Sequence, residues 1–307
     1  MVPGRGRLTG LCHTRSIAEL CVHIDEFTDP LCPWAWSAEP FRRRLRWLYD
    51  GAISWAPRMV VLAETPADQE RKGFTPERLA EASRRIARDH RMPIDSRVRD
   101  YVPASADACR AVVAAREHAE PHFARALLRE LRVHYFRGEQ IDRPEVIASA
   151  ARASGIEAER LAEWIADPAT GAALEADVAA ARKPKPAARV LDEKLANWSG
   201  GRRYTCPSYE ITRLEDGVTI SVPGFQPFAV YNTILANLVP GLERRALPSD
   251  VEEVLEWSAI PISTQEVAVM CDIDFDDARE RLGRVAVQEP VGADGFWTAQ
   301  PGVSIQR

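Results

Sequence analysis

A lone motif cysteine stands where thiol chemistry is favoured. In the stretch FTDPLCPWAWSAEPF, residues 27 to 41, Cys32 lies between an apolar run and an amphipathic run. A strand, a turn and a helix would place its thiol at a helix N-terminus, where free backbone N–H groups and the helix dipole favour the thiolate. A thiolate attacks disulfides and other electrophiles, so Cys32 is a candidate nucleophile. The alternative is that Cys32 is a small buried apolar residue.

The usual second cysteine of a redox motif is missing. A dithiol enzyme carries C-x-x-C, but the position three residues after Cys32 is Ala35. The remaining cysteines are widely scattered, and no pair has the spacing of metal ligands. We therefore expect no metal site and no tightly bound cofactor. Three of these cysteines fall in apolar runs, which predicts core packing for Cys21, Cys109 and Cys271.

The elements that would position Cys32 form a strand–helix–strand unit. LCVHIDEF reads as a short apolar strand, and Phe41, Leu45 and Leu48 follow at helical spacing. Pro40 predicts a kink or break within that helix. AISWAPRMVVL reads as a second strand, whose buried part would run from Met59 to Leu62. This order and length favour a parallel βαβ unit.

A long helical block follows, at about residues 75 to 182, and ends at the stiff connector KPKPAA. Strand patterns return at RYTCPSYEI and VTISVPGF, before an apolar helix in PFAVYNTILANLVPG. Pro207 opens the first of these strands, where a proline without an N–H favours a tight turn with a cis peptide as one option. The chain thus predicts one mixed α/β sheet interrupted by a helical subdomain.

The segment 246–307 has a different pattern. Three short helices and a hairpin with its turn at Gly292 to Gly295 predict a small winged-helix-like domain. Twelve acidic and four basic side chains follow Ala246, a net charge that repels phosphate. We therefore expect no nucleic-acid binding, and interpret this acidic domain as a packing or protein-contact unit.

Composition agrees with an ordinary soluble protein. Hydrophobic residues make up 46% and charged residues 28% of 307, and the net charge of −5 gives no attraction to nucleic acid or to an anionic membrane. Neither a signal peptide nor a membrane span is evident, which predicts a cytoplasmic protein with reduced thiols. Residues 1 to 18 are rich in Gly and Arg and predict a loosely ordered extension, in which Cys12 lies.

Three places now agree: DPLCPWAW, YTCPSYEI and GFQPFAVYNTIL. With these motifs the chain, over about residues 20 to 242, resembles the DsbA family of thioredoxin-fold proteins, and within it the cytoplasmic FrnE-like branch, where C-P-W-C occupies the same setting. The resemblance implies a thioredoxin-like α/β fold with a large helical insertion, spanning residues 19–245 before the C-terminal domain. The position of Ala35 departs from the family motif.

The resemblance also implies roles for individual residues. Cys32 matches the nucleophilic cysteine, Pro33 and Trp34 match the intervening dipeptide, and Pro207 matches the cis-proline loop that faces the motif. The residue before that proline lies against the first cysteine, so Cys206 is a candidate resolving thiol that would close a Cys32–Cys206 disulfide. The alternative is that Cys206 fills an apolar slot.

Other candidates near the motif carry weaker signals. Trp34 and Trp36 flank the thiol and form either an apolar lip for substrate or core contacts. Asp29 and Glu39 would tune the thiol if buried, although surface placement is expected. The run RRRLR is interpreted as a solvated helix face, the alternative being an anion site for a glutathione carboxylate; its arginines are Arg42, Arg43, Arg44 and Arg46.

Three functions follow from this pattern. The first is a thiol-disulfide oxidoreductase-like protein centred on Cys32, with a thiol or disulfide substrate and glutathione as a co-substrate. The second is a glutathione-dependent isomerase or transferase of the kappa-class or hydroxychromene-carboxylate isomerase type, in which a lone serine or cysteine occupies the first motif position. The third is a non-enzymatic adaptor that binds a protein partner through the C-terminal domain.

Overall fold

A four-stranded mixed sheet lies at the centre of the computed structural model, which describes residues 20–258 and 260–300. The extension expected at residues 1 to 18, with Cys12, lies outside the described residues. The strand order is β2-β1-β5-β6, with β1 parallel to β2 and antiparallel to β5. The strands are β1 (Val22–Thr28), β2 (Ile53–Met59), β5 (Ser208–Arg213) and β6 (Thr219–Val222). The predicted mixed α/β sheet is therefore confirmed.

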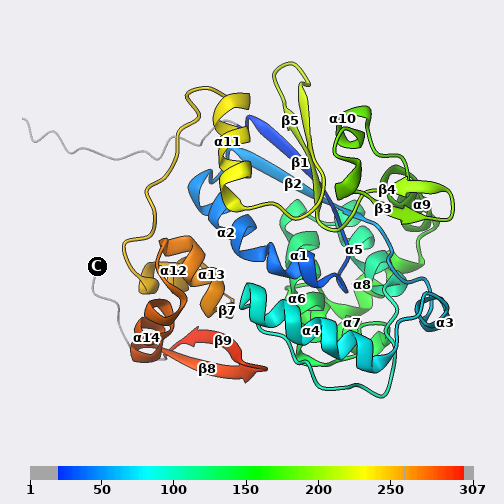
Figure 1. Ribbon diagram of the computed structural model, residues 1–307, viewed down its shortest axis with the longest axis horizontal. Coiled ribbons are helices and arrows are strands. Elements are labelled where there is room, and N and C mark those ends of the chain that lie inside the picture. Colours follow the sequence, from blue (N-terminus) through cyan, green and yellow to red (C-terminus); the bar gives the residue numbers. More distant parts are fainter. Residues whose placement is uncertain (1–19, 259, 301–307) are drawn as a thin grey trace, which may run out of the picture.

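The helices surround this sheet in the order that the sequence indicates (Figure 1). The expected helical stretch contains α4 to α9, which appear in cyan to green in the ribbon. Up to residue 245 the helices are α1 (Pro33–Ser37), α2 (Glu39–Leu48), α3 (Pro66–Arg71), α4 (Pro76–His90), α5 (Ala106–His118), α6 (Pro121–Arg137), α7 (Pro144–Ala153), α8 (Ala158–Ala166), α9 (Pro168–Ala181), α10 (Pro186–Arg189) and α11 (Phe228–Leu238). A short hairpin of β3 (Ala196–Trp198) and β4 (Gly201–Arg203) follows the turn η1 (Asp192–Lys194).

Two local details refine the sequence pattern. The predicted break in the helix after Cys32 occurs at Ala38, between α1 and α2, two residues before Pro40. Proline at the second position of α2 is tolerated because its missing N–H would have no partner there. The second strand ends at Met59 rather than at Leu62, since Val61 adopts a positive φ of 54° that a strand cannot hold.

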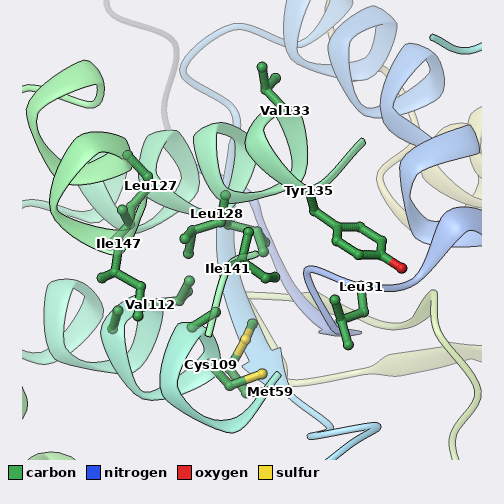
Figure 2. Close-up of a cluster of buried hydrophobic side chains, with 14 of the residues drawn as sticks. Leu31, Met59, Cys109, Val112, Leu127, Leu128, Val133, Tyr135, Ile141 and Ile147 are labelled. Atoms are coloured by element: carbon green, nitrogen blue, oxygen red, sulfur yellow. The ribbon is translucent and has the colours of Figure 1, made fainter. Parts of the chain in front are cut away.

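The helical block packs on the sheet through an apolar cluster built mainly from α5 and α6. Figure 2 shows part of this cluster, in which Cys109 lies with Met59 and Val112. Small alanines along α5 let the helices approach closely, and every residue from Ala111 to Ala115 is fully buried. This core fixes α6 as the support behind α1.

A C-terminal unit with its own small sheet lies beside α2 and α6 (Figure 1). It consists of α12 (Val251–Ser258), β7 (Ile262–Ser263), α13 (Thr264–Cys271), α14 (Phe275–Val285), β8 (Ala286–Val291) and β9 (Asp294–Ala299). The three helices and the β8–β9 hairpin lie in the segments read from the sequence, whereas the short strand β7, which pairs with β9 in the order β7-β9-β8, was not predicted. A capping box of Ser263 and Glu266 starts α13.

Apolar contacts anchor the C-terminal unit to the rest of the chain. The Phe296 ring lies 6.1 Å from the Trp36 ring, and the Trp257 ring lies 5.6 Å from that of Trp47. Gly292, at the hairpin turn, has a φ of 62°, and a Cβ atom there would come within 2.2 Å of the Ile94 carbonyl oxygen. Only glycine therefore fits this turn, which is seated on the connection after α4.

Buried ion pairs strengthen the same interface, contrary to the expected solvated face on α2. Arg43 and Arg129 both contact the Glu266 carboxylate of α13, at 2.8 and 2.6 Å, and Arg44 pairs with Asp272 at 2.8 Å. Arg42 pairs with Glu26 at 2.7 Å and also with Glu39. The prediction was wrong for Arg42 and Arg43 because their carboxylate partners lie far away in the sequence or were themselves expected at the surface. Both arginines are instead buried.

No helix within residues 20–258 and 260–300 is long and apolar enough to cross a bilayer. Over the same residues, no group of three or more His, Cys, Asp or Glu side chains is arranged to hold a metal ion.

Candidate functional site

Cys32 lies at the N-cap of α1, immediately after β1 and its turn. Its backbone is extended, with φ −75° and ψ 113°, and its carbonyl accepts the Trp36 N–H at 3.0 Å to begin the helix. Pro33 at the first helical position favours this start because its φ is already helical. Cys32 is only 5% exposed, so it is almost entirely buried.

Cys206 is the cysteine that the fold brings to Cys32. The Cys32 Sγ donates to the Cys206 carbonyl oxygen at 3.2 Å, and both side chains belong to one buried cluster with Ala35 and Tyr204. The Cys206–Pro207 peptide is cis, and Pro207 leads directly into β5. Both cysteines are free thiols in this structure. The fold thus brings Cys32 of the motif together with Cys206 and Pro207, which precede β5.

The two thiols have opposite acidities. Contact with the Cys206 thiol lowers the pKa of the Cys32 thiol, and the backbone N–H groups of Ala35 and Trp34 lower it further, although burial opposes the shift. Burial raises the pKa of Cys206 well above its ordinary value, and the neighbouring Cys32 raises it again. Cys32 is therefore the thiol suited to attack, while Cys206 stays protonated and donates toward it.

Asp29 is buried beneath the thiol helix, which corrects the expected surface placement. Its carboxylate accepts the Leu31 and Leu62 N–H groups, each at 2.8 Å, and the Ser105 hydroxyl at 2.8 Å. Burial raises the pKa of Asp29 despite these donors, and its charge raises the pKa of Cys32. Asp29 thus ties the turn after β1 and the segment after β2 to Ser105 at the start of α5, and it reduces the acidity of the thiol.

Glu39 is also buried, again contrary to expectation, and serves the interface rather than the thiol. It accepts from Arg42 and lies 3.3 Å from Arg132 and 3.5 Å from Arg129. Burial alone would raise the pKa of Glu39, but these guanidinium groups hold it well below its usual range. The carboxylate therefore stays ionised and balances part of the arginine charge.

The two tryptophans after Cys32 have different environments. Trp34 is 42% exposed, with its ring 5.0 Å from His90 and 5.6 Å from Phe225. Trp36 is fully buried, donates its indole N–H to the Pro93 carbonyl at 3.0 Å and stacks on Phe136. Trp36 therefore cannot line a substrate surface, whereas Trp34 can. An aromatic surface of Trp34, His90 and Phe225 beside the thiol is what sequence reasoning missed.

The weak signal for this aromatic surface was present in the motifs. Phe225 follows Pro223 and Gly224 in the stretch that closes the sheet, and a positive φ of 74° at Gly224 turns the chain toward α1. His90 ends α4, so neither residue belongs to the elements that carry the two thiols. Their meeting is a tertiary contact that no local pattern encodes.

The remaining described cysteines lie away from this pair. Cys109 is fully buried, its thiol 3.6 Å from Asp29, and burial raises its pKa well above the ordinary value. Cys21 and Cys271 are partly buried and pack against a core cluster, so the expected core packing is confirmed for all three, with full burial at Cys109. Burial also raises the pKa of Cys271, to about 11. Cys109 and Cys271 are therefore poor nucleophiles beside Cys32.

Proteins of similar sequence are known over nearly the full chain. The chain is 25% identical over 289 residues to the ClpXP adapter protein SpxH of Halalkalibacterium halodurans, a match that covers 90% of this chain and 88% of that protein. It is 24% identical to the ClpXP adapter protein SpxH of Shouchella clausii, over 89% of this chain and 85% of that one. The C-terminal unit is longer than the tenth of the chain that these matches leave out. The matches therefore include part of that unit.

Solved structures and a protein-family comparison place the fold. A protein of Nitrosomonas europaea assigned as a protein disulfide isomerase superposes with a TM-score of 0.54 at 16% identity, covering 71% of this chain and 97% of its own. A probable DsbA oxidoreductase of Streptomyces coelicolor superposes with a TM-score of 0.50 at 18% identity, covering 75% of this chain and 94% of its own. The DSBA-like thioredoxin domain matches residues 23–185, more than half of the sequence. The chain therefore belongs to the family of DSBA-like thioredoxin-domain proteins.

Proposed function

We propose that this protein performs thiol-disulfide exchange with a single motif cysteine, Cys32. The observation that carries the proposal is the position of Cys32 at the start of α1 with a lowered pKa, in contact with Cys206. The coarser assignment, a thioredoxin-fold protein of the oxidoreductase type, rests on the family and fold matches. The exposed face of Trp34 beside the thiol offers an apolar contact for a protein or peptide disulfide.

The proposed exchange balances as follows. The Cys32 thiolate attacks one sulfur of a substrate disulfide, forms a mixed disulfide and releases the other sulfur as a thiolate that takes a proton from solvent. A second thiol then attacks the Cys32 sulfur. If that thiol is Cys206, the substrate leaves fully reduced and the protein holds a Cys32–Cys206 disulfide. If it is glutathione, the substrate also leaves fully reduced and Cys32 holds a mixed disulfide with glutathione. A second glutathione then attacks the glutathione sulfur, so Cys32 leaves as the thiolate and glutathione disulfide is released.

Alkylation across pH tests the acidity on which the proposal rests. A free cysteine has a pKa of about 8.5, so Cys32 should be half-reactive toward iodoacetamide below that pH and Cys206 above it. Peptide mass spectrometry would report both sites in one sample, with Cys109 as the buried control. Cys32 reacting no earlier than Cys206 would contradict the assignment of Cys32 as the nucleophile.

Two serine variants test the exchange itself. Cys32→Ser should reduce disulfide exchange to the uncatalysed rate, because the attacking sulfur is gone. Cys206→Ser should accumulate a mixed disulfide on Cys32 if Cys206 resolves it, and should behave as the unmodified protein if glutathione resolves it. Glutathione binding without any disulfide reduction would instead favour the isomerase or transferase. Unchanged exchange in both variants would contradict the proposal.

A second function, that of a protein adaptor, is favoured by the extent of the similarity. The solved thioredoxin-fold structures cover 71% and 75% of this chain, whereas the two ClpXP adapter proteins cover about nine tenths and include part of the C-terminal unit. The missing second motif cysteine also fits a role in which binding matters more than redox turnover. In this function the chain would hold a protein substrate and deliver it to a ClpXP-type protease.

Degradation assays separate the two functions. With purified ClpXP, an adaptor should accelerate proteolysis of its bound protein by the same factor in the unmodified chain and in Cys32→Ser. A requirement for Cys32 would assign the effect to thiol exchange instead. Absence of any acceleration for every protein that co-purifies with the chain would contradict the adaptor function.

A further inference from the structure

An arginine-lined cavity lies between the thioredoxin part of the chain and the C-terminal unit. It has a volume of about 250 Å³, and its walls come from α2, α6, β2 and α12. Two carboxylates, Glu26 and Glu39, lie among the lining residues. Six guanidinium groups face them, from Arg42, Arg43, Arg46, Arg125, Arg129 and Arg132.

The carboxylates within reach do not balance this positive charge. Glu26, Glu39 and the adjoining Glu266 pair with the four innermost arginines, Arg42, Arg43, Arg129 and Arg132. Asp50 and Glu130 act on Arg46 and Arg129 from outside the lining. Within the described ranges, neither Arg46 nor Arg125 forms an ion pair with a carboxylate.

Burial and the excess positive charge lower the pKa of two of these arginines. Burial and repulsion from Arg46 lower the pKa of Arg125 to about 10, and burial with repulsion from Arg129 lowers that of Arg43 to about 10. The Nε atoms of Arg125, Arg129 and Arg132 are buried and make no hydrogen bond to any part of the chain that the structure describes. An anion bound in the cavity would offset this excess positive charge.

The shape of the cavity limits the kind of anion. Trp55 and Trp257 line one part of it, and the Arg46 guanidinium lies 5.7 Å from the Trp257 ring centre. A tetrahedral oxyanion presents several oxygens to guanidinium groups from different directions and can carry two negative charges. The aromatic walls leave room for a small organic group attached to it.

We propose that this cavity binds a phosphate-class oxyanion, either inorganic phosphate or a small organic phosphate monoester. Bound there, the anion would contact α2 and α6 from the thioredoxin part and lie next to α12 from the C-terminal unit. The site is separate from the Cys32 thiol, and it stands whether the protein acts by exchange or as an adaptor.

Calorimetric titration and thermal unfolding of the full chain test the site, with inorganic phosphate and phenyl phosphate as probes. Either probe should bind and raise the melting temperature, and tighter binding of phenyl phosphate would identify the monoester as the fitting source. Arg125→Gln and Arg46→Gln should each weaken binding about tenfold or more, the loss expected for one hydrogen bond to a charged group. Arg152→Gln, on the exposed face of α7, should leave affinity unchanged.

If the cavity binds the anion, Arg125→Gln should melt no lower than the unmodified chain in the absence of probe, because repulsion is relieved, and phosphate should raise its melting temperature less than that of the unmodified chain. A purely structural role of Arg125 predicts the opposite: a lower melting temperature without probe and an unchanged shift with phosphate. Failure of both probes to bind at millimolar concentration would overturn the proposal. Equal losses in Arg152→Gln and Arg125→Gln, or binding of succinate as tight as that of phosphate, would overturn it too.

Discussion

Glu266→Gln should lower the free energy of unfolding by about 3 to 5 kcal/mol, because it leaves two buried arginines without their shared counter-charge. The Glu266 side chain is fully buried, 2.8 Å from Arg43 and 2.6 Å from Arg129. It also accepts the Ser263 N–H at 2.8 Å as part of the capping box that starts α13. Glutamine keeps the shape of the side chain, removes the charge and replaces one accepting oxygen with an N–H donor. Urea denaturation at neutral pH would measure the loss.

A surface carboxylate provides the control for this measurement. Glu280 pairs with Arg284 on the exposed face of α14, where both side chains are 68% exposed, so Glu280→Gln should cost at most about 1 kcal/mol. Equal losses in the two variants would contradict the importance of the buried cluster.

The cost of Glu266→Gln should also depend on pH. Arg129 and Arg43 lower the pKa of Glu266 in the folded chain below its value of about 4.3 in the unfolded one, although burial opposes them. The folded state therefore gains stability from this carboxylate at pH values above about 4.3, and loses it as pH falls toward the folded pKa. The difference between the unmodified chain and the variant should shrink over the same range. A difference that grows as pH falls would contradict the assigned direction of the shift.

Trp36→Ala should lower the free energy of unfolding by about 3 to 5 kcal/mol, as expected when a fully buried aromatic side chain is removed. Its ring contacts Phe136 and Phe296, the Arg129 guanidinium lies 5.5 Å from its centre, and its N–H donates to Pro93. The substitution therefore leaves a cavity where α1, α6 and the C-terminal unit meet. Chemical denaturation should register it as a lower midpoint.

Trp34→Ala is the matched control two residues away. The Trp34 ring makes only edge or tilted contacts with His90 and Phe225, and the residue is 42% exposed. Its removal should therefore lower the free energy of unfolding by about 1 kcal/mol. The same substitution should slow exchange with peptide disulfides if Trp34 contacts substrate. Comparable destabilisation by the two substitutions would contradict the different environments assigned to these tryptophans.

The position of the two thiols was predictable from the sequence. Local patterns around Cys32 indicate a strand, a turn and a helix, and the resemblance to a known family indicates that Pro207 faces the motif. Together they predict that Cys206 lies against Cys32, as the 3.2 Å contact shows. The mixed sheet follows in the same way, because alternating and continuous apolar runs are local properties of the chain.

Buried charges were not predictable by these means. Asp29 and the arginines of α2 look like surface residues in a local window, since charged side chains are rarely buried unless paired. Their partners come from distant elements, such as Ser105 on the approach to α5 and Glu266 on α13. One sequence without related sequences does not show which distant carboxylate meets which arginine. The charge balance of the interface becomes visible only in the assembled fold.

The contact between Phe296 and Trp36 has a consequence for biosynthesis. Trp36 belongs to the helix that Cys32 begins, yet one of its packing partners lies 260 positions later in the chain. Chains emerge from the ribosome with the N-terminal part first. The helix that carries the thiol must therefore wait, with an incomplete core behind it, until Phe296 has left the exit tunnel. The helix that carries Cys32 is translated early, but its packing is among the last parts of the core to be completed.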